Sequence, residues 1–497
     1  MQQAIVIGGG FGGMASALRL RALGYDVQII EKLAHLGGRG QVFQRGGYTH
    51  DAGPTVITAP FLFDELFALF GENRADHIEF RPLTPWYRFQ FPDGDTFDYG
   101  GTLEETLAEI ERIHPPDVDG YRRLVDASKA IYEKGFVELA DQPFHHFTTM
   151  LKQLPSLAKL RSDRTVWEMV TRHLQHPKLQ QAFSIQPLLV GGNPFDTTSI
   201  YGLIHYLERA YGIYFAMGGT GALVRALHGL IDRAGIQVST ETTVHQLQHQ
   251  GRRITGLDTS KGPMKADLYV FNGDPLYLYQ TLLPASALGI MSRAKAKYSK
   301  LSMGLYVLFF GTTQTYPGVA HHTIWLGERY RELLADIFDR QILPEDFSLY
   351  IHRPTATDPS FAPAGHESFY VLAPVPNQQG GIDWSVEEPK LRARIIDALD
   401  STLLPNLKNV IAEPFSMTPD HFSQDYLSVH GAGFSIAPLF TQSAWFRFHN
   451  KAEDFDNLLL AGAGTHPGAG LPGVVSSAKV VETLAREFAH TALKESA

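Results

Sequence analysis

Glycines crowd one short stretch near the start of the chain, in a pattern suited to holding a phosphate group. Five glycines fall between positions 8 and 13, and Gly8, Gly10 and Gly13 have the spacing G-x-G-x-x-G. In such a loop the first glycine permits a turn, the second lets backbone approach a pyrophosphate, and the third lets the next helix pack closely. Glu31 follows as a carboxylate that can accept hydrogen bonds from a ribose, and it would repel the 2′-phosphate of NADP. These residues predict a dinucleotide site.

The elements that must position these residues are readable on both sides of the glycines. Residues 4–7 are an apolar run typical of a buried parallel strand, and residues 14–23 have a helical apolar pattern that stops at Gly24. Residues 25–30 predict the next strand, which leads into Glu31. Free N–H groups at the start of the helix would point at the phosphate. The order strand, glycine loop, helix, strand and acid predicts a Rossmann-like unit.

Two further glycine turns follow. At Gly38 and Arg39, backbone and a guanidinium would clamp the pyrophosphate from the far side. Residues 51–55 predict a tight turn that could approach a ring system closely. Much later, Val244 begins a predicted strand whose backbone could meet an adenine, and residues 272–274 end that α/β stretch.

A glycine- and proline-rich loop at 462–473 lies between a predicted strand, 458–461, and a predicted helix, 474–488. This helix would point the positive end of its dipole at a ligand, and for a flavin that favours the negative charge of the reduced ring. We therefore expect one α/β domain assembled from discontinuous segments. Its predicted segments are 1–80, 214–274 and 420–497, with a helical insertion at 81–213 and a substrate-binding sheet with helices at 275–419.

The amino-acid composition excludes several classes of function. The chain has 497 residues, 44% hydrophobic and 19% charged, which is typical of a globular protein of several domains. The net charge of −9 argues against nucleic acid as the main partner, and the absence of cysteine excludes disulfides and thiol catalysis. No signal peptide or transmembrane helix is expected from the sequence, whereas attachment to a membrane surface stays open.

Residues 144–164 alternate apolar and basic side chains. Two interpretations remain open: an amphipathic helix on an anionic membrane surface, or a helix packed on the core with a solvated basic face. Asp163 and Arg164 are the candidate catalytic pair, because they are charged and belong to the segment expected near the substrate entrance. A surface ion pair or a membrane contact is the alternative for both.

Two histidine positions need an interpretation. His466 falls in the glycine–proline loop and is expected to shape that loop through a hydrogen bond. His321 and His322 are adjacent, and adjacent residues of a strand point to opposite faces, so no metal site is predicted there.

Several longer stretches are far more specific than the glycine motif. They cover nearly the whole chain, and on them the sequence resembles the bacterial-type FAD-dependent phytoene desaturases of the flavin amine oxidase-like superfamily. The carrying stretches are EKLAHLGGRGQVF, YTHDAGPTVIT at 48–58, LLVGGNPFDTTSIYGLIHYLE at 188–208, GGTGALV at 218–224, AHHTIWLGERYRELLADIF at 320–338, DFSLYIH at 346–352, YVLAPVPN at 370–377, TQSAWFRFHN at 441–450 and LLLAGAGTHPGAGLPGVVSSAK at 458–479. Related superfamily members often carry an acidic residue where Ala463 stands here.

The resemblance implies a Rossmann-like FAD domain with an inserted mixed α+β substrate domain and a helical, membrane-facing lid. It implies desaturation of 15-cis-phytoene, most simply to lycopene, by hydride transfer to flavin N5, with quinone or oxygen as electron acceptor. It implies a peripheral position at the cytoplasmic face of the cell membrane, or in the cytoplasm. The expected cofactor-binding residues are Gly8, Gly10, Phe11, Gly12, Gly13, Glu31, Lys32, Gly38, Arg39, Gly53, Pro54, Thr55, Val244, Asn272, Asp274, Gly464, Gly473 and Val474.

Four alternatives remain open at this point. The chain could desaturate another polyene, such as diapophytoene or a hydroxycarotenoid, or act as a redox-neutral carotenoid isomerase. A flavin amine oxidase and a non-catalytic FAD-binding protein are the other two. No second strand–GxGxxG–helix unit is visible, so a separate NAD(P)H site is not expected.

Overall fold

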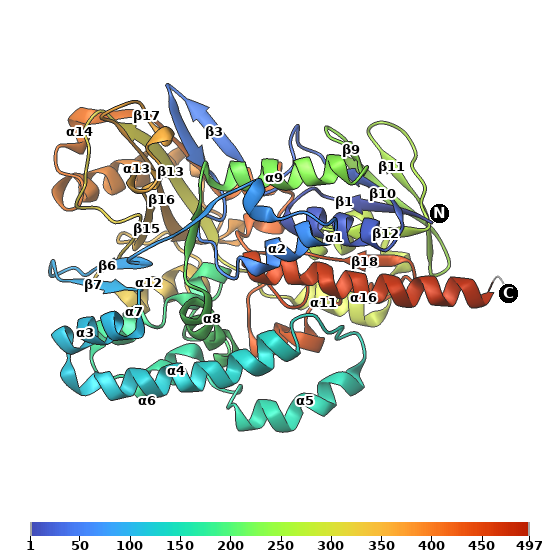
Figure 1. Ribbon diagram of the computed structural model, residues 1–497, viewed down its shortest axis with the longest axis horizontal. Helices are drawn as coiled ribbons and strands as arrows, with labels where there is room; N and C mark the ends of the chain where they lie inside the picture. The colour runs from blue at the N-terminus through green and yellow to red at the C-terminus, as the bar shows by residue number, and fades with distance from the viewer. Residues whose placement is uncertain (1, 496–497) are drawn as a thin grey trace.

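The computed structural model describes residues 2–495 (Figure 1). A five-stranded parallel sheet carries the first glycine motif, in the order β18-β12-β1-β2-β9. Its strands are β1 (Gln3–Ile7), β2 (Asp26–Ile30), β9 (Gln237–Ser239), β12 (Leu268–Phe271) and β18 (Leu458–Leu460). The strands predicted at 4–7, 25–30 and 458–461 are confirmed.

Alternating side chains bury both faces of this sheet. In β1, Ala4 and Val6 pack on the helical face, whereas Ile5 and Ile7 pack on the opposite face. Three helices cover the helical face: α1 (Phe11–Ala22), α9 (Gly219–Arg233) and α16 (Leu471–Glu495), which begins and ends beyond its predicted bounds (Figure 1). Helix α1 is buried almost all round, because it lies among the sheet and the other two helices. The opposite face is covered by the antiparallel hairpin β10 (Val244–Gln250) and β11 (Arg253–Thr259).

A second, seven-stranded mixed sheet lies beside the first, in the order β17-β13-β16-β15-β14-β6-β7. Its strands are β6 (Tyr87–Gln90), β7 (Thr96–Tyr99), β13 (Gly304–Thr312), β14 (His322–Trp325), β15 (Leu349–His352), β16 (Glu367–Val375) and β17 (Ile411–Met417). Strands β6 and β7 fall inside the segment 81–213 that the sequence predicts as helical, so that boundary needs correction. The reason is a non-local pairing of β6 with β14, from a distant part of the chain.

Helices fill the remaining space. The helical group at the bottom of Figure 1 contains α3 (Leu103–Ile113), α4 (Val118–Tyr132), α5 (Phe147–Lys159), α6 (Val166–His173), α7 (Pro177–Ala182) and α8 (Leu203–Tyr211). The other helices are α2 (Phe61–Ala68), α10 (Pro275–Tyr277), α11 (Ile290–Tyr298), α12 (Tyr330–Ala335), α13 (Trp384–Ser401), α14 (Leu407–Val410) and α15 (Pro419–Asp425). Short two-stranded pairs join β3 (Val42–Arg45) to β4 (Tyr48–Asp51), and β5 (Phe80–Pro82) to β8 (Tyr214–Ala216). Among the described residues, none of the helices is both long and apolar enough to span a bilayer.

Candidate functional site

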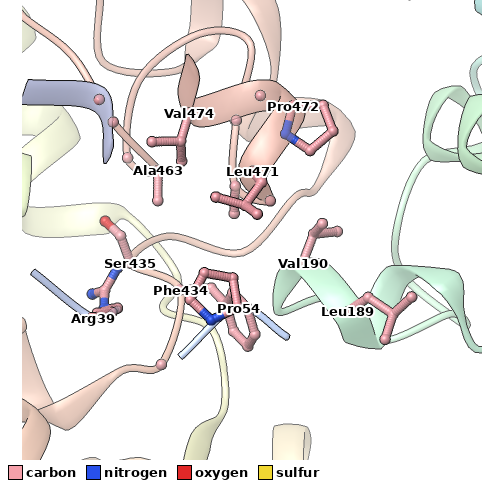
Figure 2. Close-up of a pocket in the computed structure, with 18 of the residues that line it drawn as sticks. Arg39, Pro54, Leu189, Val190, Phe434, Ser435, Ala463, Leu471, Pro472 and Val474 are labelled. Atoms are coloured by element: carbon pink, nitrogen blue, oxygen red, sulfur yellow. The ribbon is translucent and has the colours of Figure 1, made fainter. Parts of the chain in front are cut away.

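One cavity of about 600 Å³ runs from the glycine loops into an apolar interior. All the predicted cofactor-binding residues line it except Gly13. Figure 2 shows part of its wall, where Ala463 of the C-terminal loop and Leu471 and Val474 of α16 lie above Phe434. The fold thus brings together residues that are hundreds of positions apart, although their role as cofactor contacts stays a prediction.

The first glycine loop is held so tightly that no side chain fits at its third glycine. A Cβ on Gly13 would lie 1.9 Å from the carbonyl oxygen of Gly8. The amide of Asn272 donates a hydrogen bond of 3.3 Å to the same oxygen, which ties this loop to the end of β12. Gly13 therefore packs helix against loop instead of facing the cavity, as the motif requires of its third glycine.

Glu31 lies at the end of β2, and its carboxylate is anchored by backbone on both oxygens. Oε2 accepts a hydrogen bond of 2.7 Å from the Gly9 N–H, and Oε1 accepts one of 2.7 Å from the Leu33 N–H. Burial raises the pKa of this carboxyl, while the backbone donors lower it. Each carboxylate oxygen keeps a further lone pair, so Glu31 can still accept from a ribose hydroxyl at the cavity wall.

Arg39 and Gly53 meet across the next part of the wall. A Cβ on Gly53 would lie 2.0 Å from the carbonyl oxygen of Arg39, so the two turns touch through bare backbone. The Arg39 guanidinium donates a 2.6 Å hydrogen bond to the Ser428 hydroxyl, while its buried Nε has no partner in the part of the chain that the structure describes. An unpartnered, buried guanidinium N–H at the cavity fits an anionic ligand such as a pyrophosphate.

Asp51 fixes the turn that contains Gly53, Pro54 and Thr55. Its carboxylate accepts hydrogen bonds from the N–H groups of Thr220 (3.0 Å) and Gly221 (3.4 Å), at the start of α9. Burial raises the pKa of Asp51 to about 6, against the lowering effect of these two donors. The side chain thus joins the turn to a helix N-terminus, where a carboxylate is favoured.

Two of the predicted cofactor-binding residues, Asp274 and Lys32, use their charged groups in hydrogen bonds within the protein. Asp274 accepts hydrogen bonds from Leu276 N–H, Val429 N–H and the Ser435 hydroxyl, so it caps α10 and holds the 428–435 loop. The Lys32 ammonium donates to the carbonyl oxygens of Gln424 and Asp425 at the end of α15. Both residues line the cavity, but their charged groups already have partners.

Arg447 organises the C-terminal loop, a role that no pattern in the sequence indicates. This fully buried guanidinium donates hydrogen bonds to the carbonyl oxygens of Ala463 (2.5 Å), Thr465 (2.9 Å) and Gln442 (3.2 Å). His466 bonds through Nε2 to the Leu139 carbonyl at 2.8 Å, and burial lowers its pKa to about 4. The expectation that His466 shapes the loop by a hydrogen bond is confirmed.

Beyond these loops the cavity wall is almost entirely apolar and comes from both the helical group and the seven-stranded sheet. The apolar wall includes Leu139, Met150, Leu157, Leu188, Ile204, Met303, Leu305, Leu333, Ile337 and Leu372. Polar residues interrupt this wall, among them Lys134, Gln153 and Glu208. Glu208 on α8 is buried beside Tyr87 and Tyr99. Burial raises its pKa to about 8, against the lowering effect of the two neighbouring hydroxyls. At neutral pH this wall therefore presents a neutral carboxyl.

Asp163 and Arg164 are not brought to the cavity. Neither residue lines it, and both border a shallow depression on the surface. The Asp163 side chain is 63% exposed and pairs with Arg161 at 3.2 Å, not with Arg164. Their catalytic assignment stays a prediction that this geometry does not support, and the alternative of a surface ion pair fits Asp163 better.

The histidines at 321 and 322 lie in a different geometry from the one expected. His321 precedes β14, so strand alternation does not separate it from His322. Both approach His352, and the three side chains place potential ligand atoms within 4.8 Å of one another. The argument that excluded a metal site from adjacency alone is therefore wrong.

The cavity has the shape and chemistry of a flavin dinucleotide site. Bare backbone and an unpartnered guanidinium N–H suit the diphosphate, a backbone-anchored carboxylate suits the ribose, and the start of α16 suits the ring. The apolar extension beyond it suits a large, uncharged substrate.

Known proteins agree with this geometry. The family model described as flavin containing amine oxidoreductase matches residues 11–481. A lycopene-forming phytoene desaturase of Pantoea ananas is 42% identical over 98% of this chain and 99% of its own. A lycopene-forming phytoene desaturase of a Paracoccus species is 45% identical over 96% of this chain and 95% of its own.

A solved structure shares the fold at low sequence identity. Cyclohexylamine oxidase from Brevibacterium oxydans superposes with a TM-score of 0.61 at 14% identity, covering 98% of this chain and 99% of its own. The family match and the relatives, which align along nearly the whole chain, agree with the site that the fold assembles. The chain belongs to the flavin containing amine oxidoreductase family, and within it to the bacterial phytoene desaturases.

Proposed function

We propose that this protein uses FAD to desaturate phytoene to lycopene. The observation that carries the proposal is that one cavity joins the glycine loops to a long apolar wall. A dinucleotide and an oily polyene could then meet inside the protein. Two relatives that align along almost the whole chain carry the printed name lycopene-forming phytoene desaturase, which supports the same substrate and product.

Each desaturation step removes two hydrogens from a saturated C–C bond beside a polyene, and the conversion to lycopene repeats this step. One leaves as a hydride and the neighbouring one as a proton, which creates a C=C bond and lengthens the conjugation. FAD, when bound, supplies the two-electron acceptor for the hydride. The positive charge left on the substrate is delocalised along the polyene, so the protein needs little acid–base apparatus.

The side chains then have two tasks: to align the substrate and to exclude water. The apolar wall contributed by α5, α8, α12 and the seven-stranded sheet performs both. Glu208, the carboxyl of that wall, is mostly neutral at neutral pH. It is therefore a poor general base, and it places no charge against an uncharged hydrocarbon substrate.

We propose that α5 is a membrane-facing lid over this cavity. Met150 and Leu157 of α5 line the cavity, whereas Phe147, Leu151 and Leu154 are between 45% and 48% exposed. Lys152 and Lys159 lie on the same helix. A helix with an inner apolar face, an outer apolar edge and basic side chains suits an anionic membrane surface. Phytoene dissolved in that membrane would enter beside α5, and electrons would leave to a quinone or to oxygen.

The domain assignment is likewise a proposal. We assign 1–80, 214–274 and 420–497 to the FAD-binding part, and 275–419 together with β6 and β7 to the substrate-binding sheet. The rest of 81–213 forms the helical insertion. Support comes from the two sheets, each of which collects strands from distant segments of the chain.

The test is an assay with purified protein, FAD and phytoene in liposomes. Desaturation to lycopene gives longer-wavelength absorbance bands and a product lighter by the hydrogens removed. Unchanged conjugation with altered isomer composition indicates a carotenoid isomerase, and turnover of diapophytoene alone indicates the other polyene. Hydrogen peroxide released from amines without carotenoid turnover indicates an amine oxidase. No reduction of bound flavin by any of these substrates would overturn an enzymatic role.

A further inference from the structure

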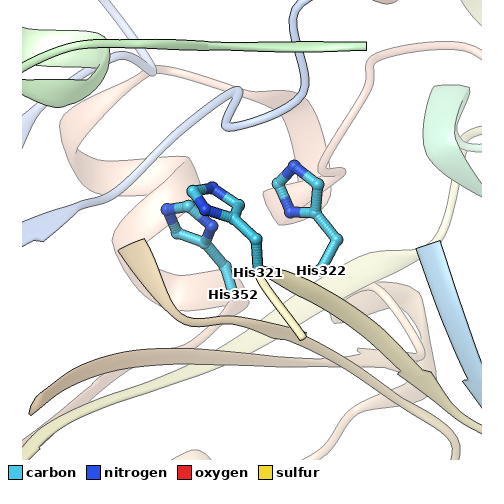
Figure 3. Close-up of side chains that lie close together, drawn as sticks. All are labelled: His321, His322 and His352. Carbon is cyan, nitrogen blue, oxygen red and sulfur yellow. The ribbon is translucent and has the colours of Figure 1, made fainter. Parts of the chain in front are cut away.

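Three histidines meet in the interior, outside the apolar cavity. His321, His322 and His352 are 6%, 0% and 1% exposed, and Figure 3 shows their three rings close together. The ring centres are 4.6 Å apart for His321 and His322, 4.8 Å for His321 and His352, and 5.3 Å for His322 and His352. None of the three lines the cavity that holds the predicted FAD contacts.

Strand pairing explains why the rings converge. His322 on β14 and His352 on β15 are directly opposite in an antiparallel pair, so their side chains leave the same face of the sheet. His321 precedes β14, and its carbonyl accepts a hydrogen bond of 2.9 Å from the Arg353 N–H. This contact holds the His321 backbone beside the end of β15, and Figure 3 shows all three rings on one side of the strands.

The hydrogen bonds leave at least one nitrogen of each ring without a partner among the described residues. His321 Nδ1 contacts the Thr357 hydroxyl at 2.7 Å, and His322 Nδ1 contacts the Tyr350 hydroxyl at 2.8 Å. Within residues 2–495, the Nε2 atoms of both rings and both ring nitrogens of His352 have no hydrogen-bond partner. Buried polar atoms without partners are uncommon because each costs free energy. One bound ion could be the common partner of the unpartnered ring nitrogens of these three histidines.

We propose that these three imidazoles bind a divalent transition metal, with Zn²⁺ as the best fit. Zinc takes nitrogen ligands at about 2.0–2.1 Å in a tetrahedral arrangement, which puts ring centres roughly 5 Å apart. The observed ring separations match that value, and small rotations of the side chains bring the nitrogens into range. Water or hydroxide would complete the fourth position, as in other three-histidine zinc sites.

The outer contacts match those of metal-binding histidines. A ligating histidine usually donates its other ring N–H to an oxygen, which fixes the tautomer. Here the Thr357 and Tyr350 oxygens would receive those protons from His321 and His322. With His322 as donor, the Tyr350 hydroxyl would in turn donate to Thr55 Oγ1, 2.5 Å away. Because Tyr350 and Thr55 both line the cavity, the metal would set the direction of a hydrogen bond in the substrate cavity wall.

The experiment measures metal on the FAD-loaded protein after dialysis into metal-free buffer and exposure to Zn²⁺ alone. We expect stoichiometric zinc by elemental analysis, and visible absorption bands of a tetrahedral site when Co²⁺ replaces zinc. H322Q and H352Q should lose both signals. H205Q is the matched control, because His205 is also a buried histidine but lies outside the cluster.

A gentler variant keeps the test valid if H322Q or H352Q fails to fold. T357V removes only the contact to His321 Nδ1, and it should weaken zinc binding by about 10–100-fold while flavin absorbance is retained. Folded, FAD-loaded wild-type protein that takes up neither zinc nor cobalt would overturn the proposal. Equal zinc content in wild type, H322Q and H352Q would overturn it as well.

Discussion

Arg447 donates a 2.9 Å hydrogen bond to the carbonyl oxygen of Thr465, and the same guanidinium also reaches Ala463 and Gln442. A buried cation thus holds the turn that follows β18, where the chain leads into the cavity loop. The relationship joins two segments that the sequence presents as unrelated motifs.

The first prediction concerns this brace. R447M should weaken FAD binding at least tenfold, because three buried carbonyl oxygens lose a charged donor, each such bond being worth about 1.5–3 kcal/mol. Flavin fluorescence on titration with FAD measures the affinity. R252M is the control, since Arg252 pairs with Asp456 on the exposed surface. Equal affinities of the two variants would contradict the brace.

The second prediction concerns the bare backbone contacts. G13A and G53A should each lower thermal stability and flavin content, because the new Cβ would lie 1.9 Å from Gly8 O or 2.0 Å from Arg39 O. We expect a loss above about 2 kcal/mol for each, in the range of overpacking mutations. G318A has open space around its Cβ and should change stability by less than about 0.5 kcal/mol. Wild-type flavin content in G13A and G53A would contradict this prediction, because it would show that the loops can shift to accept a Cβ.

The third prediction is a pH dependence of stability from Glu208. Its folded pKa of about 8 lies above its ordinary value of 4.5, so the native state holds the proton that the unfolded state releases. Stability from this group is therefore lost as pH rises from about 4.5 to about 8, at up to about 1.4 kcal/mol per pH unit. E208Q should remove that slope.

Denaturant unfolding of E208Q and wild type at several pH values measures the difference. The stability of E208Q relative to wild type should grow as pH rises through this window. E104Q, a change of an exposed carboxyl on α3, should leave the slope unchanged. Parallel pH profiles of wild type and E208Q would contradict a neutral buried Glu208.

The fourth prediction tests α5 as a membrane contact. L151S and L154S should reduce flotation with anionic vesicles, because each removes exposed apolar surface from the proposed contact. K152E should weaken binding further at low salt, each basic residue near an anionic surface being worth about 1 kcal/mol. V386S is the control, because Val386 is 48% exposed on α13, a helix outside the helical group that contains α5. Unchanged flotation of all α5 variants would remove the helix from the membrane contact.

The sequence by itself determined the Rossmann-like entry of the chain, because this part of the fold is local. Glycine spacing, an apolar run on each side and Glu31 lie within about thirty residues, so each turn requirement is visible in the residue types. The expected His466 hydrogen bond also followed from a local loop. The specific stretches downstream implied the family that the comparisons support.

Only the tertiary structure decided what depends on distant segments. The pairing of β6 with β14 places the β6–β7 hairpin in the second sheet. The hydrogen bonds of Arg447, the burial of Glu208 and the approach of His322 to His352 also depend on contacts between distant segments. The cavity is the same kind of property, since its wall comes from both sheets and the helical group. Burial and convergence of side chains arise from contacts between remote segments, so the residue types within one segment do not predict them.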